Sequence, residues 1–179
     1  MRTVDLVSMK QKSRKIKYLS CNYYSFAHLL NRTNLDVVLV GDSAGHVMQG
    51  KSNTLSVTME HIKYHVECVA SAIKRPLLVA DMPFLSIGFD TDKTAQNAGV
   101  LMTAGAEAIK AEGAGKIHCQ QFEYLVSIGI PVMGHIGTQP QSVYVYSGFR
   151  IQGKGGLSER LIQEAKDLEN AGCFVMGLE

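Results

Sequence analysis

Short apolar runs recur along the chain, and each ends at an ionisable residue. The clearest lies in residues 36–41, where four consecutive aliphatic side chains precede Gly41 and Asp42. Because no polar residue alternates with these side chains, the run predicts a strand that is buried on both faces. Four later runs end in turn at Asp81, Glu112, His135 and Glu179. Apolar strands with ionisable tips are typical of a parallel α/β protein whose active site lies at the carboxyl ends of the strands.

Helical spacing separates these runs. Residues 59–73 carry apolar side chains at alternating steps of three and four, which predicts an amphipathic helix that starts after Thr58. Two glycine-rich stretches, 43–57 and 135–156, predict loops, the first with room for a short strand; a loop as long as the second is usually functional. A further strand is expected over 16–21, and further helices over 4–10, 24–30 and about 118–127. A helix to Thr103 is expected to be capped by Thr91 or Asp92, and the last helix to be capped by Ser158 and ended by Gly172.

The alternation of strands and helices predicts a parallel sheet with right-handed crossovers. We expect one domain over residues 1–179, with six strands and no linker or repeat. An open doubly wound sheet requires only about six strands, whereas a (β/α)₈ barrel requires eight and about 250 residues. Because the last expected strand ends at Glu179 with no helix after it, the pattern predicts a chain whose C-terminal part is missing.

Composition restricts the possible partners. The 179 residues carry a net charge of +2, with 46% hydrophobic and 19% charged residues, as expected for a globular enzyme. The sequence has no Lys/Arg run interleaved with aromatic residues, which argues against nucleic-acid binding. It also has no run of about eighteen apolar residues, so no membrane-spanning helix is predicted. The N-terminus lacks an apolar signal segment, which favours a cytoplasmic location. The four cysteines form no CxxC pair, so reduced, buried thiols are expected.

Three carboxylates at strand tips point to a metal site. If their strands are neighbours, Asp42, Asp81 and Glu112 converge, and three like charges close together favour a bound cation. Oxygen ligands with room for water and substrate suit Mg²⁺ better than Zn²⁺. Lys110 stands two residues before Glu112, so the two side chains face the same side of the strand. A lysine beside a metal site can hold the carboxylate of a substrate.

The last two strand tips complete a site for enolate chemistry. His135 offers a hydrogen-bond donor and Glu179 a candidate general base. A metal that chelates a 2-oxo acid acidifies its C3 proton, because the metal stabilises the oxygen charge that develops when the proton leaves. The competing interpretation is that a single Asp after a strand acts as a helix cap or turn residue, which is the commoner role of such a residue. Five ionisable tips together make that interpretation harder to sustain.

A second candidate metal site lies on the helix after Thr58. His61 and His65 are four residues apart and Cys68 follows three residues later, a spacing that can hold Zn²⁺. However, Ile62 occupies the position of the glutamate in a zinc protease motif, and the three residues run beside the apolar stripe. An ordinary amphipathic helix face is therefore favoured over a ligand set. Residues 153–156 are rich in glycine but lack the full phosphate-loop pattern.

Five stretches carry motifs that belong together. Their sequences are VLVGDS at 38–43, LVADMPF at 78–84, IKAEG at 109–113, GHIGTQPQS at 134–142 and GFRIQGK at 148–154. In these motifs and their order the chain resembles the ketopantoate hydroxymethyltransferase (3-methyl-2-oxobutanoate hydroxymethyltransferase) family. The resemblance implies a (β/α)₈ TIM barrel, here incomplete with about six of eight βα units, that assembles as a homodecamer. It also implies transfer of a hydroxymethyl group from 5,10-methylenetetrahydrofolate to 3-methyl-2-oxobutanoate, which gives 2-dehydropantoate for pantothenate biosynthesis.

The resemblance also implies roles for the matching residues. Asp42 and Asp81 would ligate Mg²⁺, and Glu112 would do so directly or through water. Glu179 would be the base that removes the C3 proton. The residues that would contact the 2-oxo acid come from the strand tips as well, and they are Asp42, Ser43, Asp81, Lys110 and His135. Of these, the serine and the lysine would hold the carboxylate of the acid. The implied partners are thus a 2-oxo acid, a folate and further copies of the chain, with neither nucleic acid nor membrane.

Three departures from the family pattern leave other interpretations open, and one of them is that Ala44 and His46 stand where larger apolar residues are expected. Residues 20–23 read Ser-Cys-Asn-Tyr where the family has a Thr-Ala-Tyr-Asp-like turn, and the expected C-terminal βα units are missing. The first alternative is a related barrel enzyme of the phosphoenolpyruvate mutase and isocitrate lyase kind, although the Lys-Cys-Gly lid motif of those enzymes does not occur. The second is a non-catalytic or partner-dependent fragment. With two open sheet edges and an apolar interior, such a fragment is expected to aggregate when it is produced alone.

Overall fold

The six strands form one parallel sheet whose spatial order follows the chain. The computed structural model describes residues 1–88 and 90–179. Each strand pairs in parallel with the next one along the sequence. The strands are β1 (Tyr18–Ser20), β2 (Val37–Val40), β3 (Leu77–Asp81), β4 (Ala108–Glu112), β5 (Val132–Ile136) and β6 (Val175–Leu178). A doubly wound sheet would reverse its strand order at a switch point, so this uninterrupted order identifies the incomplete (β/α)₈ barrel among the two expected folds.

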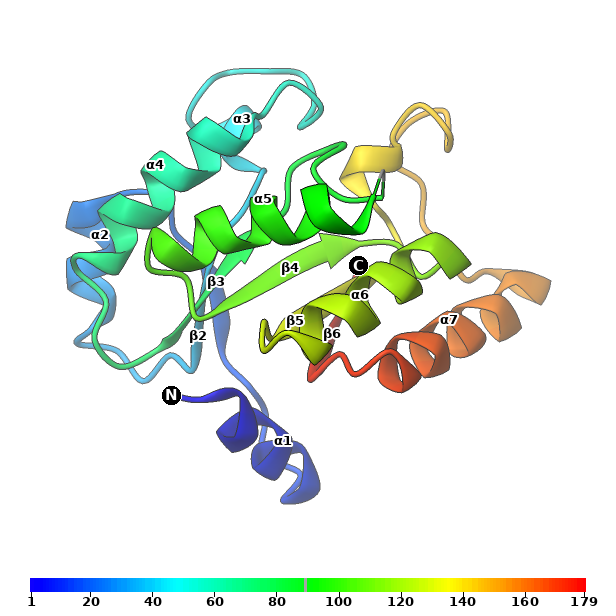
Figure 1. Ribbon diagram of the computed structural model, residues 1–179, viewed down its shortest axis with the longest axis horizontal. Helices are drawn as coiled ribbons and strands as arrows, with labels where there is room; N and C mark the ends of the chain where they lie inside the picture. The colour runs from blue at the N-terminus through cyan, green and yellow to red at the C-terminus, as the bar shows by residue number, and fades with distance from the viewer. Residues whose placement is uncertain (89) are drawn as a thin grey trace.

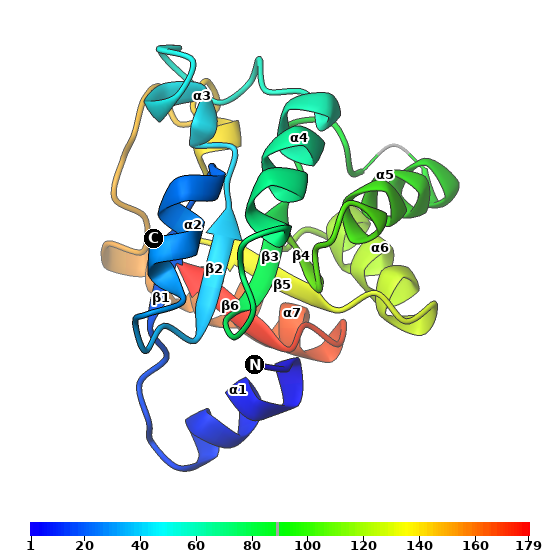
Figure 2. The same ribbon diagram turned by 90° about the vertical axis from the view of Figure 1, so that its left-hand side faces the viewer.

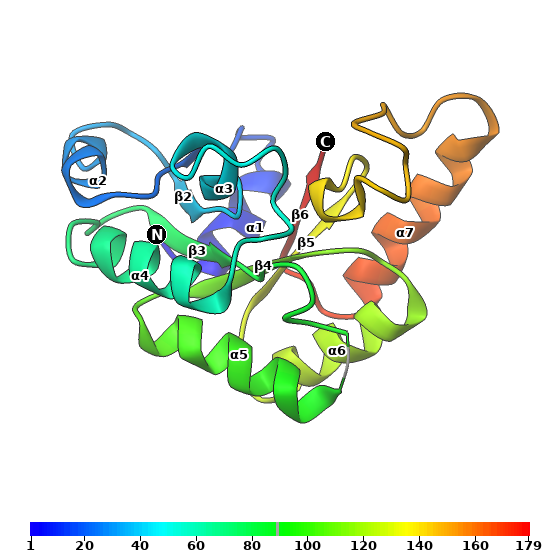
Figure 3. The ribbon, with the colours of Figure 1, turned by 90° about the horizontal axis from the view of Figure 1, so that it is seen from above.

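The helices that connect the strands cover the outer face of the curved sheet. Seen from above, they form an arc outside the strands (Figure 3), while the loops that follow the strands gather on one side (Figure 1). These connecting helices are α2 (Tyr24–Leu30), α4 (Met59–Ala70), α5 (Thr91–Thr103), α6 (Lys116–Ser127) and α7 (Ser158–Asn170). None of the helices in the described part of the chain is long and apolar enough to cross a membrane.

Alternation along each strand divides the core into two parts. On β2, Val38 and Val40 belong to the cluster shared with the helices, whereas Val37 and Leu39 belong to a second cluster inside the curve of the sheet. Side chains alternate between the two faces of a strand. Ionisable residues that lie an even number of positions from the inner cluster residues of the same strand therefore also point inward. On β4 that rule places both Lys110 and Glu112 on the inner face, as the sequence predicts.

Helix α1 (Thr3–Gln11) closes the inner face at the amino ends of the strands. It lies apart from the arc of the other helices, below the sheet (Figure 2). Its Leu6 and Met9 are buried against the first inward residues of the sheet, among them Leu77 and Met133. The interior is therefore apolar at the α1 end and ionisable at the carboxyl end, which confines chemistry to the loop side.

Most of the expected elements are confirmed, and the exceptions have local causes. The stripe on α4 is buried at Ile62, Val66 and Val69. The expected loop over 43–57 instead begins with a short helix, α3 (Ala44–Val47), and contains no strand. Helix α5 is capped neither by Thr91 nor by Asp92 but by Asp90, whose carboxylate accepts a hydrogen bond from the Lys93 amide at 2.6 Å.

The long loop after β5 contains two single turns. These are the 3₁₀ turns η1 (Pro140–Ser142) and η2 (Gly155–Leu157). Proline is well placed at the start of the first turn, because its fixed φ suits that position. The turn at η1 folds the loop back over the carboxyl ends of the strands, where Gln141 contacts Asp42 and Glu112.

Candidate active site

The site is built around an ion pair between neighbouring strands. Asp81 ends β3 and pairs in register with Lys110 of β4. The Lys110 Nζ atom donates to both carboxylate oxygens of Asp81, at 2.9 and 3.0 Å, and both side chains are buried. Burial alone would lower the pKa of Lys110, but the carboxylates of Asp81 and Glu112 outweigh it and raise the pKa. The lysine is therefore a permanent buried cation among the strand tips.

Two further carboxylates flank this ion pair. The Asp42 amide donates to Asp81 Oδ2 at 3.3 Å, so Asp42 and Asp81 lie side by side. Burial, and then the charge of Asp81, raises the pKa of Asp42 to about 7. On the other side, burial also raises the pKa of Glu112 to about 7, although Lys110 opposes the shift. Three carboxylates thus share a single lysine, and the local charge balance favours one more cation.

Gln141 joins the two flanking carboxylates from the loop above them. Its side-chain Nε2 donates to Asp42 Oδ2 at 2.9 Å and to the Met82 carbonyl at 2.9 Å, and its backbone amide donates to Glu112 Oε2 at 3.0 Å. Sequence reasoning included Gln141 in a motif but gave it no role. The only feature of the sequence that pointed to a role for Gln141 was its position in a long glycine-rich loop. Its contacts with the carboxylates depend on how that loop folds, which no local pattern predicts.

His135 and Glu179 stand across from the ion pair. His135 is buried with its Nδ1 3.6 Å from Glu112 Oε1 and its Nε2 3.8 Å from Glu179 Oε2. Burial, and then the nearby Lys110, lowers the pKa of His135 to about 4, so the imidazole is neutral at pH 7. The Glu179 side chain is 63% exposed and lies at the end of β6, open to an incoming molecule.

Gly137 allows the β6 end to approach the loop. Its φ is +89°, and a methyl group there would overlap the Glu179 carbonyl oxygen. That oxygen accepts a hydrogen bond from the Thr138 amide at 2.8 Å. The backbone that carries Glu179 is therefore held by the first residues of the loop.

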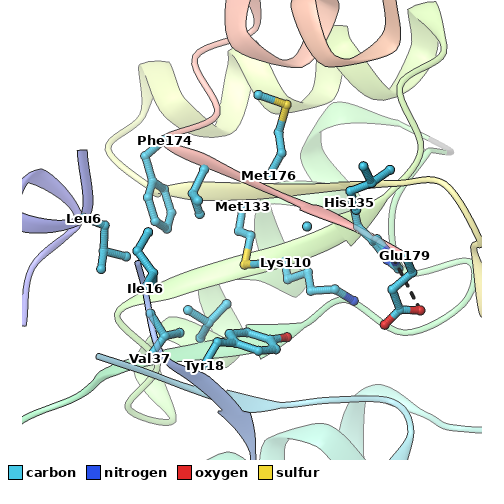
Figure 4. A pocket seen from close by; sticks show the side chains of 14 residues that line it. Leu6, Ile16, Tyr18, Val37, Lys110, Met133, His135, Phe174, Met176 and Glu179 are labelled. Carbon is cyan, nitrogen blue, oxygen red and sulfur yellow. Dashed lines mark ion pairs between the residues drawn. The ribbon is translucent and has the colours of Figure 1, made fainter. Parts of the chain in front are cut away.

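A cavity of about 290 Å³ connects three of the site residues, Lys110, His135 and Glu179, with the apolar interior (Figure 4). Lys110, His135 and Glu179 lie at one end of the cavity, and Leu6 and Phe174 line the other. The lining also includes Tyr18 of β1, whose ring extends toward the polar end. Burial raises the pKa of Tyr18 to about 12, so its phenol stays protonated. Tyr18 was missed from the sequence because three residues of strand are too short for the alternation to show.

The remaining predicted site residue, Ser43, follows Asp42 directly. It stands at the start of α3, and a side chain on Gly41 would come within 3.1 Å of its Oγ. Ser43 thus lies at the same edge of the sheet as Asp42 and Asp81. All of the predicted strand-tip residues are brought to one end of the inner face.

The chemistry of the donors fits a divalent cation with a preference for oxygen. Asp42, Asp81 and Glu112 offer carboxylates in a buried setting, and Glu112 Oε1 has no hydrogen-bond partner in the described structure. As arranged there, residues 1–88 and 90–179 contain no set of three His, Cys, Asp or Glu side chains already gathered around one point. Oxygen donors of this kind, with room for water, suit Mg²⁺.

The second candidate metal site on α4 is not formed. His61 Nδ1 accepts a hydrogen bond from the Thr58 amide at 3.1 Å and so helps to cap the helix. His65 Nδ1 is 2.6 Å from the Asn22 carbonyl oxygen. Both rings are engaged with the backbone, which supports the interpretation of an amphipathic helix face.

The raised pKa values of Asp42 and Glu112 predict how metal-free stability depends on pH. Near pH 7 each carboxyl holds part of a proton in the folded state that the unfolded chain, with a pKa near 4, has already released. Stability falls with rising pH wherever the folded state binds more protons. We therefore expect the free energy of unfolding to fall by about 1–2 kcal/mol between pH 6.5 and 8. His135, whose pKa is lowered to about 4, acts in the opposite direction mainly below about pH 7 and offsets only a small part of this fall.

Urea unfolding in EDTA at several pH values tests this expectation. With saturating Mg²⁺ the fall should become smaller or reverse, because an ion that binds the charged carboxylates stabilises the folded state increasingly as they ionise. A metal-free stability that rises steadily from pH 6.5 to 8 would contradict the assignment of two protonated carboxyls.

Solved structures with the same fold define the general class. The chain matches phosphonopyruvate hydrolase in complex with oxalate and Mg²⁺ with a TM-score of 0.71 at 12% identity, over 100% of this chain and 64% of that one. It matches 2,3-dimethylmalate lyase, described as a member of the PEP mutase/isocitrate lyase superfamily, with a TM-score of 0.68 at 14% identity, over 99% of this chain and 63% of that one. The architecture is thus the barrel type found in these enzymes.

Sequence comparison defines the family more closely. The ketopantoate hydroxymethyltransferase family pattern matches residues 1–179, and the chain belongs to this family. The 3-methyl-2-oxobutanoate hydroxymethyltransferase of Nitrosopumilus maritimus (strain SCM1) is 44% identical over 176 residues, covering 98% of this chain and 63% of that protein. The enzyme of the same name from Legionella pneumophila (strain Paris) is 41% identical over 180 residues, covering 100% and 69%. The chain therefore spans about two thirds of the length of these relatives.

Proposed function

We propose that this protein catalyses the Mg²⁺-dependent transfer of a hydroxymethyl group from 5,10-methylenetetrahydrofolate to 3-methyl-2-oxobutanoate, forming 2-dehydropantoate. The observation that carries the proposal is the convergence of Asp42, Asp81 and Glu112 around the buried Lys110. It occurs in a chain that belongs to the ketopantoate hydroxymethyltransferase family. The match between site and family favours this activity over others that the barrel fold supports.

The carboxylates are proposed as the metal ligands. Asp42 and Asp81 would hold Mg²⁺, with Glu112 acting directly or through water. A bound Mg²⁺ polarises the carbonyl of a chelated 2-oxo acid and so acidifies its C3 proton. Because Lys110 stays charged and faces the cavity, it is proposed to pair with the substrate carboxylate, together with Ser43.

The substrate is proposed to be deprotonated and oriented by residues opposite the ion pair. Glu179 would take the C3 proton, and the carbon left with the electron pair would form a bond to the methylene carbon of the folate. Both bonds from that methylene carbon to the folate nitrogens would break, so that tetrahydrofolate leaves and one water molecule supplies the hydroxyl group of the product. His135 is neutral, so it can donate one N–H to substrate without adding charge to the site. The apolar lining, with Val79 and Met133, offers a surface for the branched end of the acid.

The first half of this reaction can be tested without folate. In D₂O with Mg²⁺, the protein should catalyse loss of the C3 proton signal of 3-methyl-2-oxobutanoate in ¹H NMR, and EDTA should stop it. The matched control is 3,3-dimethyl-2-oxobutanoate, which has no C3 proton and should inhibit the exchange competitively. Exchange that is absent, or that proceeds equally well in EDTA, would refute metal-dependent enolate formation.

We further propose a cytoplasmic homo-oligomer, a decamer as expected for the family, that acts on small molecules only. Exposed apolar side chains are consistent with an interface, and examples around the loop side are Val47, Val145 and Ile151. The alternatives are a lyase or mutase of the related barrel superfamily and a partner-dependent, non-catalytic chain. Turnover of 3-methyl-2-oxobutanoate with the folate distinguishes the transferase from both.

A further inference from the structure

We infer that Gln141 is a positioning residue that couples the fold of the loop after β5 to metal binding. The inference rests on the proposed function, because it takes Asp42 and Glu112 as metal ligands. Gln141 belongs to the 3₁₀ turn η1 and reaches across the sheet to a residue 99 positions away in the chain. It is the residue through which the loop contacts both carboxylates that flank the Asp81–Lys110 pair.

The contacts of Gln141 fix one oxygen of each flanking carboxylate. The two hydrogens of its side-chain amide match two acceptors, Asp42 Oδ2 and the Met82 carbonyl, each at 2.9 Å. Two acceptors on the same nitrogen leave one amide orientation that satisfies both. The backbone amide of the same residue holds Glu112 Oε2 at 3.0 Å. One residue therefore sets the rotation of two carboxylates at the carboxyl ends of different strands.

The second carboxylate oxygen of Glu112, which Gln141 does not contact, is available to a ligand. With Oε2 of Glu112 held by Gln141, the other oxygen, Oε1, is buried, has no hydrogen-bond partner among residues 1–88 and 90–179, and lies 3.6 Å from His135 Nδ1. A buried carboxylate oxygen without a partner is costly unless a cation or donor meets it. Gln141 thus presents Glu112 with one oxygen satisfied and the other available. Outer partners that orient metal ligands in this way typically change metal affinity about 10–100-fold when they are removed.

The loop cannot move away while these bonds persist. Thr138 Oγ1 donates to the Arg150 carbonyl at 3.0 Å, so the two arms of the loop are joined close to η1. Arg150 and Lys154 are exposed on the second arm, where trypsin can reach them. If metal binding stabilises the orientation of Asp42 and Glu112, it also stabilises the loop that Gln141 anchors. Metal should therefore protect the loop from cleavage.

Gln141→Met tests the inference, with Gln139→Met as the matched control. Methionine keeps the length of the side chain and leaves the hydrogen bond from the backbone amide to Glu112 in place. It removes the two hydrogen bonds that the side-chain amide donates to Asp42 and to the Met82 carbonyl. Isothermal titration with Mn²⁺ should show a 10–100-fold weaker Kd for Gln141→Met and an unchanged Kd for Gln139→Met. The side chain of Gln139 faces Ser142 rather than a carboxylate. Gln141→Asn, which is one methylene too short to reach both acceptors, should weaken binding in the same direction.

Limited trypsinolysis of the unaltered protein gives a second measurement that does not depend on any variant. Saturating Mn²⁺ should slow cleavage after Arg150 and Lys154 several-fold, and Gln141→Met should lose this protection while Gln139→Met keeps it. Unaltered Mn²⁺ affinity in Gln141→Met, or metal-independent cleavage in the unaltered protein, would overturn the inference and leave the proposed function standing. Failure of the unaltered protein to bind Mn²⁺ at all would overturn both.

Discussion

Replacing Lys110 with Met should raise the KM for 3-methyl-2-oxobutanoate at least about 100-fold and destabilise the metal-free protein by about 3–5 kcal/mol at pH 7. The second effect follows because removing one partner of a buried ion pair leaves an uncompensated charge, here on Asp81. The first follows because Lys110 is the buried cation that faces the cavity in the described structure. Losing a buried charge partner for a substrate carboxylate costs about 2–5 kcal/mol of binding.

Steady-state kinetics and urea unfolding measure the two effects of Lys110→Met separately. Added Mg²⁺ should restore part of the stability but not the KM, because the ion can neutralise Asp81 without replacing the contact to substrate. Lys116→Met is the control, since Lys116 is exposed at the start of α6 and should leave both quantities unchanged. A Lys110→Met protein with an ordinary KM would show that the substrate carboxylate binds elsewhere.

Replacing Glu179 with Gln should reduce deuterium exchange at C3 of 3-methyl-2-oxobutanoate by about 100–10,000-fold, the usual contribution of a general base. Glutamine keeps the size of the side chain and removes its basicity. Mn²⁺ affinity should be unchanged, because Glu179 is not one of the proposed ligands. His135 is the nearest other base, but its pKa is lowered to about 4, which makes it a poor proton acceptor at pH 7.

Exchange followed by NMR at saturating Mg²⁺ gives the rate for Glu179→Gln directly. Glu123→Gln on the outer side of α6 is the matched control and should exchange at the unaltered rate. Unchanged exchange in Glu179→Gln would mean that another group removes the proton. In that case the side chain at the end of β6 would serve only to orient His135.

The sequence predicted the ionisable end of the sheet because strand geometry imposes it. On β4 the period of two places Lys110 and Glu112 on one face, whatever the neighbouring loops do. The parallel order β1 to β6 then brings Asp42 and Asp81 beside them, since all carboxyl ends meet on the same side of the sheet. These steps require only local patterns and topology, and the structure brings the predicted residues together.

The contributions of the loops could not be predicted in the same way. Gln141 reaches Asp42 only because the turn at Pro140 folds the loop back, a contact between residues 99 positions apart that no local pattern encodes. Four residues of α3 are about one helical turn, too few to show a period. The cap of α5 was misplaced by one residue because Asp90, Thr91 and Asp92 all have side chains that can cap.

Hydroxymethyl transfer by this protein is proposed to depend on a metal held by the strand-tip carboxylates. The measurement that tests it most directly is formation of 2-dehydropantoate from 3-methyl-2-oxobutanoate and 5,10-methylenetetrahydrofolate, followed by mass spectrometry. It should use the protein in the length that its source cells make, with and without EDTA. We expect product in the presence of Mg²⁺, none in EDTA, and recovery when Mg²⁺ is added back. A well-folded protein that binds Mg²⁺ and the oxo acid but forms no product would contradict the proposed activity.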